Sequence, residues 1–285
     1  MRSVLITGGA GFFGTAFVKR MLSMDFNGPN RIVVFSRGEH RQADMARELA
    51  ALDPHERLRF FIGDVRSRDR LRRAMEGIEV VVNAAALKRI DTAAYNPLEV
   101  KATNIDGAAN VIEAAQDAGV RKVIALSTDK AFQPVSAYGT SKAFAESLFL
   151  AANNIRGKSG PIFSACRYGN IFASAGSVVP IWRKILATSD TVPVTDPECT
   201  RFFMTIDEAV DLVLTTINTM RGGEIAIPTL PAYRLGDLAE AMGAKMDVRG
   251  LPSFEKRHES MCEGNSSDKA RRMSVDELRE ALKND

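Results

Sequence analysis

The chain has 285 residues, 45% of them hydrophobic and 26% charged, and its 38 basic side chains nearly balance the 35 acidic ones. This composition is typical of a soluble globular protein and does not favour a nucleic-acid partner. The densest basic stretch, Arg66–Arg73, is interrupted by Asp69 and predicts the solvated face of a short helix.

The cysteines and the apolar runs narrow the setting further. Cys166, Cys199 and Cys262 are too far apart in sequence for a disulfide framework or a metal site, and they favour a reducing compartment. No run is long enough to span a membrane, and a strand-like segment from Ser3 leaves no room for a signal peptide. We therefore expect a soluble, cytoplasmic protein without metal or membrane partner.

Strand-length apolar runs alternate with amphipathic helical segments through the first half of the chain. The expected strands are Val4–Thr7, Arg31–Phe35, Arg59–Ile62, Val80–Asn83, Lys122–Ser127 and Ile162–Arg167. The expected helices are Gly11–Met24, Ala43–Leu52, Arg68–Met75, Val100–Ala118 and Ala137–Asn153. This alternation predicts an α/β fold, a Rossmann-type doubly wound parallel sheet covered by helices on both faces.

After about residue 170 the alternation of strands and helices becomes less regular, and prolines separate shorter elements. Helices are expected at Ile206–Met220, Leu235–Met242 and Ser274–Lys283, the last with Ser274 and Glu277 as a capping box. We expect residues 1–170 to form a dinucleotide-binding domain that carries the catalytic residues. Residues 171–285 would form mainly a small substrate-binding lobe, with some segments returning to the sheet domain.

A glycine-rich turn lies between the first expected strand and helix. Gly8 permits a sharp turn, Gly11 lets the backbone approach a pyrophosphate, and Gly14 allows the helix to pack closely on the sheet. The helix N-terminus that follows, at Phe12 and Phe13, offers free N–H groups to an anion. The turn therefore predicts dinucleotide binding.

The end of the second expected strand concerns the choice of dinucleotide. Proteins that bind NAD place Asp or Glu there, whereas this chain has Ser36 and Arg37, followed by Arg41. A guanidinium suits a ribose 2′-phosphate, so the sequence favours NADP over NAD. Solvated arginines are the alternative explanation.

Two short segments supply candidate catalytic groups. Tyr138 and Lys142 lie one helical turn apart, and a cation beside Tyr138 would favour a phenolate that can accept a proton. Thr128, Asp129 and Lys130 end the fifth expected strand, where such sheets bind their ligands. Asp129 and Lys130 offer an acid and a base at one place. A solvated turn with an incidental ion pair is the alternative.

Several segments, in chain order, resemble the inverting UDP-N-acetylglucosamine 4,6-dehydratases, extended short-chain dehydrogenases/reductases of the polysaccharide biosynthesis type. The matching segments are Thr7–Gly14, Phe61–Val65, Ala84–Lys88, Ser127–Lys130, Tyr138–Lys142, Arg167–Asn170 and Thr200–Phe202. Ser127–Lys130 is the most specific, because related retaining dehydratases resemble it but carry an acidic residue where Lys130 stands.

The resemblance implies a reaction on a UDP-N-acetylhexosamine with transiently reduced, bound NADP. Tyr138 would deprotonate the C4 hydroxyl while hydride leaves C4, and Lys130 would then remove the C5 hydrogen. Asp129 would protonate the departing C6 hydroxyl. Hydride return to C6 and protonation of C5 on the opposite face give a 4-keto-6-deoxy sugar inverted at C5. Thr128 would bond near the C4 oxygen, and Lys142 would also hold the nicotinamide ribose.

The resemblance also implies the ligand contacts and an oligomeric assembly. Beyond the glycine turn and the arginines, the cofactor would contact Asp64, Val65, Ala84, Ala85, Ala86 and Ser127. The nucleotide sugar would contact Lys88, Asn170, Val179, Arg201 and Glu255. Related enzymes form oligomers, so a homo-oligomer is expected.

The chain departs from the family pattern in the lobe. Pro252–Glu259 stands where the family carries Arg-Pro-Gly-Glu-Lys-Leu-His-Glu, so a proline replaces the arginine that would bind the pyrophosphate. Arg249 or Arg257 could substitute for it. The lobe is also shorter than the family pattern, and Phe132 and Gln133 replace small residues, which could narrow the pocket.

Two other functions stay open. A nucleotide-sugar 4-epimerase would share the glycine turn and the Tyr138–Lys142 pair, but it would not need Asp129 and Lys130. A cofactor-binding interaction module that has lost turnover is suggested by Pro252 and the short lobe. The presence of all the candidate catalytic residues together argues against it.

Overall fold

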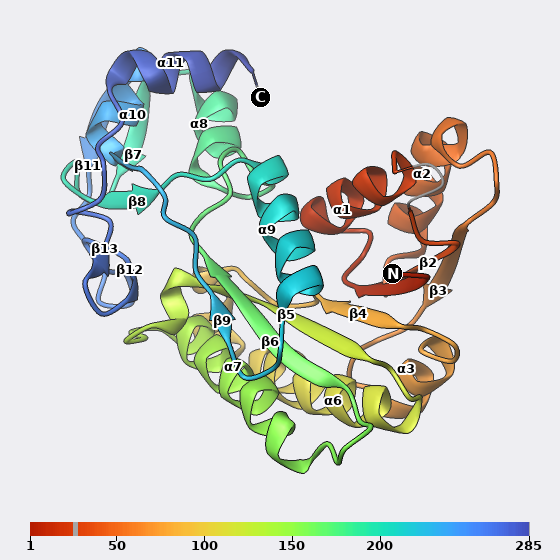
Figure 1. Ribbon diagram of the computed structural model, residues 1–285. Coiled ribbons are helices and arrows are strands. Elements are labelled where there is room, and N and C mark those ends of the chain that lie inside the picture. The colour runs from red at the N-terminus through yellow and green to blue at the C-terminus, as the bar shows by residue number, and fades with distance from the viewer. Residues whose placement is uncertain (25–27, 285) are drawn as a thin grey trace.

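The structure is a computed structural model that describes residues 1–24 and 28–284. Across these residues the main sheet has seven parallel strands in the order β3-β2-β1-β4-β5-β6-β9 (Figure 1). The strands are β1 Ser3–Thr7, β2 Arg31–Ser36, β3 Leu58–Ile62, β4 Val80–Asn83, β5 Lys122–Thr128, β6 Ile162–Tyr168 and β9 Ile225–Ala226. The six expected strands are confirmed to within one residue at each end, and so is the Rossmann-type doubly wound sheet.

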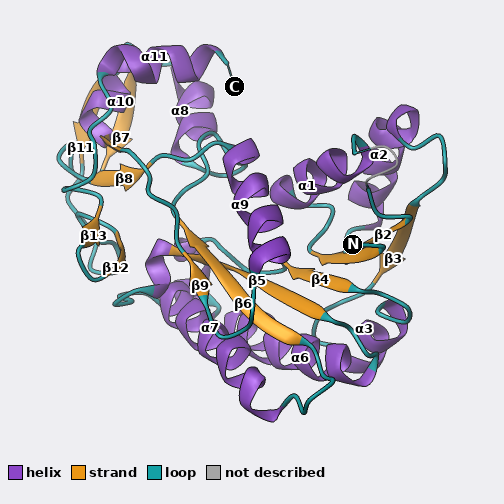
Figure 2. Cartoon of the chain, viewed as in Figure 1, coloured by secondary structure: helices purple, strands orange, loops and turns teal. Residues whose placement is uncertain are grey.

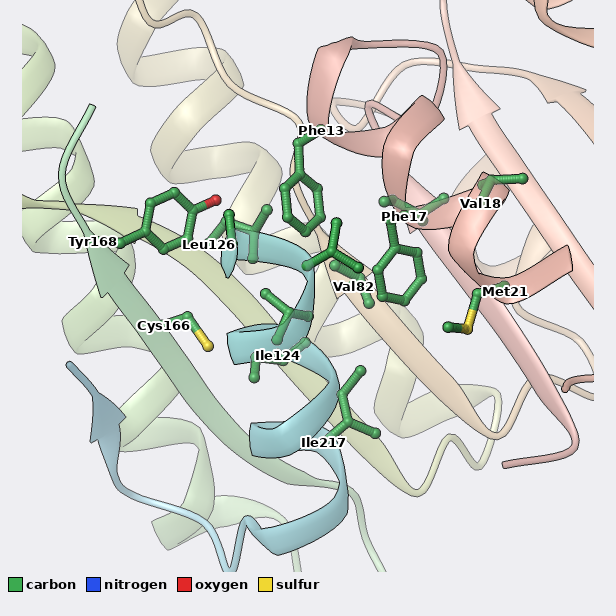
Figure 3. Packing of buried hydrophobic residues seen from close by; sticks show 14 of the residues in the cluster. Phe13, Phe17, Val18, Met21, Val82, Ile124, Leu126, Cys166, Tyr168 and Ile217 are labelled. Atoms are coloured by element: carbon green, nitrogen blue, oxygen red, sulfur yellow. The ribbon is translucent and has the colours of Figure 1, made fainter. Parts of the chain in front are cut away.

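Helices cover both faces of this sheet (Figure 2). One face carries α1 Phe12–Leu22, α2 Glu39–Leu49 and α9 Ile206–Thr219, and the other carries α3 Arg68–Ala74, α6 Gly107–Asp117 and α7 Ala137–Ile155. Because successive strand residues point to opposite faces, Ile6 packs in the first core and Leu5 in the second. Figure 3 shows the first core, where Phe17 of α1 and Ile217 of α9 meet Ile124 of β5.

The last strand of the sheet was not predicted from the sequence. β9 has two residues and pairs with β6 at Ala165 and Cys166. So short a strand leaves no detectable alternation in the sequence. Together with α9, it brings residues 206–226 back onto the sheet after the chain has left it for the lobe.

The helix expected over Val100–Ala118 is interrupted. It consists of α5 Pro97–Val100, a π-helical segment Lys101–Asp106 and α6. The wider turn presents the buried Asn104, whose Nδ2 donates to the Leu87 carbonyl (3.0 Å) and to Ser141 Oγ (2.9 Å). The π-helical turn thus ties the loop after β4 to α7, an arrangement common beside functional sites.

The remaining elements form a small lobe; Val179, Trp182 and Leu278 pack in a third core there, whereas Phe202 and Met261 pack in the first core. They are α8 Val178–Leu186, β7 Thr191–Val194, β8 Thr200–Phe202, β10 Ala232–Arg234, α10 Leu235–Ala241, β11 Lys245–Val248, β12 Ser260–Cys262, β13 Asn265–Ser266 and α11 Val275–Lys283. α10 and α11 confirm the expected helices, and the Ser274–Glu277 capping box is present. α8 and the short α4 Ile90–Tyr95 were not predicted. Among the described residues, no helix is long and apolar enough to cross a bilayer.

We predict that Gly14→Ala lowers the free energy of unfolding by about 1–3 kcal/mol, the usual cost of overpacking. A Cβ at Gly14 would overlap the backbone of Gly9, which can move only with the whole turn. Gly38→Ala is the control, because its Cβ would lie an ordinary 3.6 Å from Arg41 Cβ. Denaturant unfolding of both variants tests this, and equal stabilities would contradict it.

Candidate active site

The centre of the candidate site is the turn that follows β5. Thr128 ends the strand, and a single 3-10 turn, Asp129–Ala131, begins. Thr128 Oγ1 donates to Asp129 Oδ1 at 2.9 Å and accepts from the Lys130 backbone N–H at 3.4 Å. Asp129 is fully buried, and its Oδ2 has no hydrogen-bond partner among the described residues. An unsatisfied buried carboxylate oxygen is costly, so it marks a place where chemistry or a ligand is expected.

Lys130 extends from this turn into a cluster of oxygen atoms. Its Nζ lies 3.1 Å from Asp129 Oδ1, 3.1 Å from Asn170 Oδ1 and 3.3 Å from Glu259 Oε1. Burial by itself lowers the pKa of Lys130, but the charges of Asp129 and Glu259 outweigh burial, so the pKa is raised above its ordinary value. Lys130 is therefore an ammonium here, and it must give up that proton before it can act as a base.

Tyr138 lies in the first turn of α7, whose N-cap Ser136 accepts a hydrogen bond from Gly139 N at 3.1 Å. Burial raises the pKa of Tyr138 to about 12, although the charge of Lys130 and a hydrogen bond with Thr128 act in the opposite direction. The cation that favours its phenolate is thus Lys130, whereas the sequence had suggested Lys142. Tyr138 is a neutral phenol in this state.

Lys142 points away from solvent, and its Nζ donates to the Leu126 carbonyl at 2.6 Å. Burial lowers the pKa of Lys142 to about 8, partly offset by the charge of Glu146 one turn further along α7. Lys142 and Tyr138 both show burial disfavouring their charged forms. Both side chains are buried, so electrostatic interactions with their neighbours are stronger than in water.

A second buried network adjoins the candidate catalytic turn, Asp129–Ala131. Ser127 Oγ donates to Glu146 Oε2 at 2.6 Å, and the same carboxylate pairs with Arg167. Arg167 also donates to the Met261 carbonyl of the lobe, and its guanidinium lies 5.8 Å from the centre of the Phe132 ring. The structure thus places the Ser127 hydroxyl on Glu146, although the resemblance implied a cofactor contact for this residue.

The lobe brings a buried arginine, Arg201, and an acidic residue, Glu255, to the site. Arg201 Nη2 lies 2.7 Å from Glu255 Oε1, and its Nη1 donates to the carbonyls of Thr200 (2.8 Å) and Arg257 (3.1 Å). Lys256 Nζ donates to the Phe132 carbonyl at 2.6 Å, so this part of the lobe is fastened to the catalytic turn. The expected substrate contacts Arg201 and Glu255 are therefore in direct contact with each other.

The other expected substrate contacts differ in their burial. Val179 is fully buried in the core of the lobe with Trp182, so its side chain packs inside the lobe. Lys88 is exposed and has no side-chain hydrogen bond or salt bridge to the residues that the structure describes. Arg249 pairs with Asp247, and Arg257 pairs with Asp196, with side chains 66% and 52% exposed. Arg201, by contrast, is a buried guanidinium beside the catalytic turn.

The glycine-rich turn has the geometry expected for a dinucleotide. Gly8 adopts φ +64°, and a Cβ there would lie 3.0 Å from the Ala85 backbone, so the turn and the loop Ala84–Ala86 are in close contact. Gly11 is the N-cap of α1 and has no side chain that could cap the helix, so the first N–H groups of the helix can bind an anion. Phe12 is exposed, while the Phe13 ring packs in the core.

Charged groups surround the ends of β2 and β3. Arg37 Nη1 lies 3.8 Å from Asp64 Oδ2, whereas Arg66 Nη2 lies 2.7 Å from the same atom. Burial raises the pKa of Asp64, but the hydrogen bonds from Arg66 and the charge of Arg37 outweigh it and leave the pKa lowered. Arg37 and Arg41 are exposed, and neighbouring Val65 is buried in the second core.

Sequence reasoning missed several residues that the structure brings to these sites. The buried Gln42 donates to the Ser36 carbonyl (3.0 Å) and to Ser36 Oγ (2.9 Å), and so fixes the end of β2. Glu146 holds Arg167, and Glu259 reaches Lys130. His258 and Glu259 match the last two residues of the family segment Arg-Pro-Gly-Glu-Lys-Leu-His-Glu, which was the available signal for Glu259. Gln42 and Glu146 could be found only from the fold. In the described ranges, no group of three or more His, Cys, Asp or Glu side chains could hold a metal ion.

The chain is similar to several known proteins over most of its length. The chain is 42% identical over 269 residues to UDP-N-acetylglucosamine 4,6-dehydratase (inverting) from Campylobacter jejuni, covering 93% of this chain and 79% of that one. It is 39% identical over 276 residues to a UDP-glucose 4-epimerase from Rickettsia felis, covering 94% and 80%. The solved structure of Pen from Bacillus thuringiensis has a TM-score of 0.93 at 32% identity, covering 100% of this chain and 98% of that one.

These matches also bear on the length of the chain and on the family. The chain matches Pen over nearly the whole of both chains, so the two have similar lengths. Residues 4–278 match the family described as polysaccharide biosynthesis protein. The chain therefore belongs to the polysaccharide biosynthesis protein family, as its motifs had indicated.

Proposed function

We propose that the protein is an NADP-dependent UDP-N-acetylglucosamine 4,6-dehydratase, a hydro-lyase that forms a 4-keto-6-deoxy sugar inverted at C5. The observation that carries the proposal is the buried Asp129–Lys130 pair beside Tyr138 at the carboxyl end of β5. Elimination of water needs one group that takes a proton from carbon and another that gives a proton to the departing hydroxyl. The similarity to the Campylobacter jejuni enzyme supports the same substrate.

A nicotinamide dinucleotide fits the residues present. When bound, it would supply a hydride acceptor at C4 that later serves as the hydride donor at C6. Gly8, Gly11 and the N-terminus of α1 would hold its pyrophosphate, because a side chain on either glycine would crowd the turn. The loop Ala84–Ala86 would line the ribose beside it.

The adenosine end of the cofactor would lie at β2 and β3. Asp64 and Val65 would flank the adenine, and the exposed Arg37 and Arg41 would pair with a 2′-phosphate. Asp64 is already neutralised by Arg66, so it would repel the phosphate weakly. This arrangement supports NADP over NAD.

Tyr138 and its neighbours would perform the first proton transfer. Tyr138 would accept the proton of the C4 hydroxyl, and Thr128, which hydrogen-bonds with it, would orient the same oxygen. Because burial has raised its pKa, the phenolate is a strong base once formed. Lys142, which is buried and donates to the Leu126 carbonyl, would turn to the cofactor ribose and bring its charge beside Tyr138.

The Asp129–Lys130 pair would perform the elimination. Transfer of one proton across the 3.1 Å between Lys130 Nζ and Asp129 Oδ1 turns an ion pair into a neutral amine and a neutral carboxyl. The amine then takes the C5 proton, and the carboxyl gives its proton to the C6 hydroxyl, which leaves as water. The pair thereby regains the charges of its resting state.

The lobe would bind the nucleotide. Arg201 would meet the diphosphate and Glu255 a ribose hydroxyl, while Asn170 and Lys88 would contact the sugar side of the substrate. Because Pro252 offers no charge, the buried Arg201 would carry the diphosphate contact without the family arginine. We propose on this basis that residues 171–285 act mainly as the substrate-binding lobe.

The assembly and the compartment belong to the same proposal. Tyr95, Leu98, Phe144 and Ile155 on α4, α5 and α7 are apolar and exposed, with Tyr95 90% exposed, which supports a homo-oligomer. Cys166, Cys199 and Cys262 are free thiols, which supports a reducing cytoplasm.

A 4-epimerase is the second candidate, because the Rickettsia felis relative carries that name. An epimerase would use Tyr138 and Lys142 but would leave the costly burial of Asp129, Lys130 and Glu259 without a purpose. Proton NMR of the protein with UDP-N-acetylglucosamine in heavy water separates the two. We expect a 4-keto-6-deoxy product with deuterium at C5 and coupling constants of the inverted ring. A product changed only at C4 would identify an epimerase, and no reaction would favour an inactive binding module.

Variants of the turn after β5 and of α7 should separate the first step, reduction of the cofactor, from the second, hydrogen exchange at C5. We expect Lys130→Ala to abolish hydrogen exchange at C5 while still allowing reduction of bound cofactor by substrate. Tyr138→Phe should block that reduction by about 100-fold or more, the usual contribution of a general base. Single-turnover absorbance of the reduced nicotinamide measures the first step and deuterium uptake the second. Normal turnover by either variant would contradict its role.

The choice of cofactor is tested at Arg37. Arg37→Ala should weaken NADP binding by about tenfold or more, because a charge-assisted hydrogen bond contributes about 1.5–3 kcal/mol. NAD lacks the 2′-phosphate and should lose little. Arg47→Ala is the control, since Arg47 is an exposed arginine of α2 that pairs with Asp44. Titration calorimetry with both dinucleotides decides, and equal losses for NADP and NAD would refute the contact.

A further inference from the structure

Glu259 belongs to the lobe, yet its carboxylate reaches the catalytic turn of the sheet domain. Its Oε1 lies 3.3 Å from Lys130 Nζ, and the residue is only 1% exposed. Ser267 fixes its backbone on both sides: Ser267 Oγ accepts from Glu259 N at 2.9 Å, and Ser267 N donates to the Glu259 carbonyl at 2.7 Å. Glu259 is therefore held in place by the lobe and does not swing in from the surface.

The groups that face Glu259 come from several elements. Lys130 and Asp129 lie on the turn after β5, Lys256 Nζ lies 3.6 Å from Glu259 Oε2, and the charge of Arg201 acts from β8. Burial raises the pKa of Glu259, but these cations outweigh it and keep the pKa lowered.

The surrounding groups keep this cluster electrically balanced. Glu255 neutralises Arg201, and the phenols of Tyr138 and Tyr233 are buried beside the charges with raised pKa values. Glu259 is thus an ionised carboxylate in a dry cluster. Its Oε2 accepts no hydrogen bond from the described residues.

The proton transfer proposed above turns Lys130 into a neutral amine and removes its ion pair with Asp129. Whenever Asp129 carries the proton destined for the C6 hydroxyl, it loses the charge that attracts the lysine. Asn170 is neutral, so Glu259 is then the anion in direct contact with Lys130 Nζ. The neutral amine can still donate one N–H to Asn170 Oδ1 and another to Glu259, and the two contacts together fix the direction of its lone pair.

We propose that Glu259 is a positioning residue that holds Lys130 in line with the substrate while Asp129 changes its protonation, and that it makes this step depend on the docked lobe. The proposal rests on the dehydratase function proposed above. Lys256 strengthens the dependence, because it binds both Glu259 and the Phe132 carbonyl of the catalytic turn. Glu259 and Lys256 thus both connect the lobe to the turn after β5.

Glu259→Gln tests the proposal, because glutamine keeps the shape of the side chain and removes the charge. We expect C5 exchange to slow by about 10- to 100-fold, as misplacement of a reacting group does, while cofactor reduction by substrate changes by less than about threefold. Glu263→Gln makes the same chemical change at an exposed position in the next turn and should leave both steps unchanged. Glu259→Asp should recover part of the exchange rate.

The pH profile distinguishes positioning from simple support of the fold. The negative charge of Glu259 stabilises the Lys130 ammonium, so its removal should let the neutral amine form at lower pH. The rising limb of the exchange profile should therefore move to lower pH in Glu259→Gln, with a lower plateau, and should stay in place in Glu259→Asp. Equal losses in both steps without this displacement, or no difference from Glu263→Gln, would overturn the proposal.

A measurement that needs no turnover separates this proposal from the proposed function. The ¹³Cε resonance of Lys130, assigned by its absence in Lys130→Arg, is titrated in the wild type and in Glu259→Gln. If the wild type does not act on UDP-N-acetylglucosamine, the proposed function fails, and the titration still reports on the contact. A lysine that loses its proton at lower pH in the variant supports the role of Glu259, and unchanged titration overturns it.

Discussion

The candidate site depends on one constraint, the burial of Lys130 among carboxylates that come from different parts of the chain. Taking charges out of water is costly unless each charge meets its partner in good geometry. Asp129 is next to Lys130 in sequence, whereas Glu259 comes from the lobe, far along the chain. The lobe therefore supplies part of the electrostatic balance of the catalytic turn, so the two parts of the molecule are joined by charge as well as by packing.

The doubly wound sheet explains why these groups meet. All its strands are parallel, so the turn after β5, the loop after β6 with Asn170 and the loop after β4 share one edge. The lobe contacts this edge through Lys256 and through Arg167, which binds the Met261 carbonyl. Tyr138 and Lys142 are buried near this edge. Burial raises the pKa of Tyr138 and lowers that of Lys142, so it favours the neutral form of each. A dry site of this kind strengthens every later interaction with a ligand.

Local patterns were enough to predict most of this arrangement. The glycine turn, the Asp129–Lys130 pair and the Tyr138–Lys142 spacing each lie within one turn or one strand end, so their geometry follows from nearby residues. The network of Glu146 with Arg167 and the contact of Glu259 with Lys130 join distant positions, and no spacing rule relates such pairs. The same limit applies to Arg201: its burial beside Glu255, with Arg249 and Arg257 at the surface, depends on how the lobe folds.

The sequence by itself determined the alternation of strands and helices, the parallel sheet and the identity of the residues at its carboxyl edge, because hydrophobic periodicity and turn chemistry are local. Only the tertiary structure decided the two-residue strand β9, the π-helical segment before α6 and the raised pKa of Lys130. β9 is held by backbone hydrogen bonds to β6, and such bonds do not depend on which side chains β9 carries. A pKa depends on burial and on charges brought from elsewhere, and Lys130 acquires its second carboxylate from a residue that lies far along the chain.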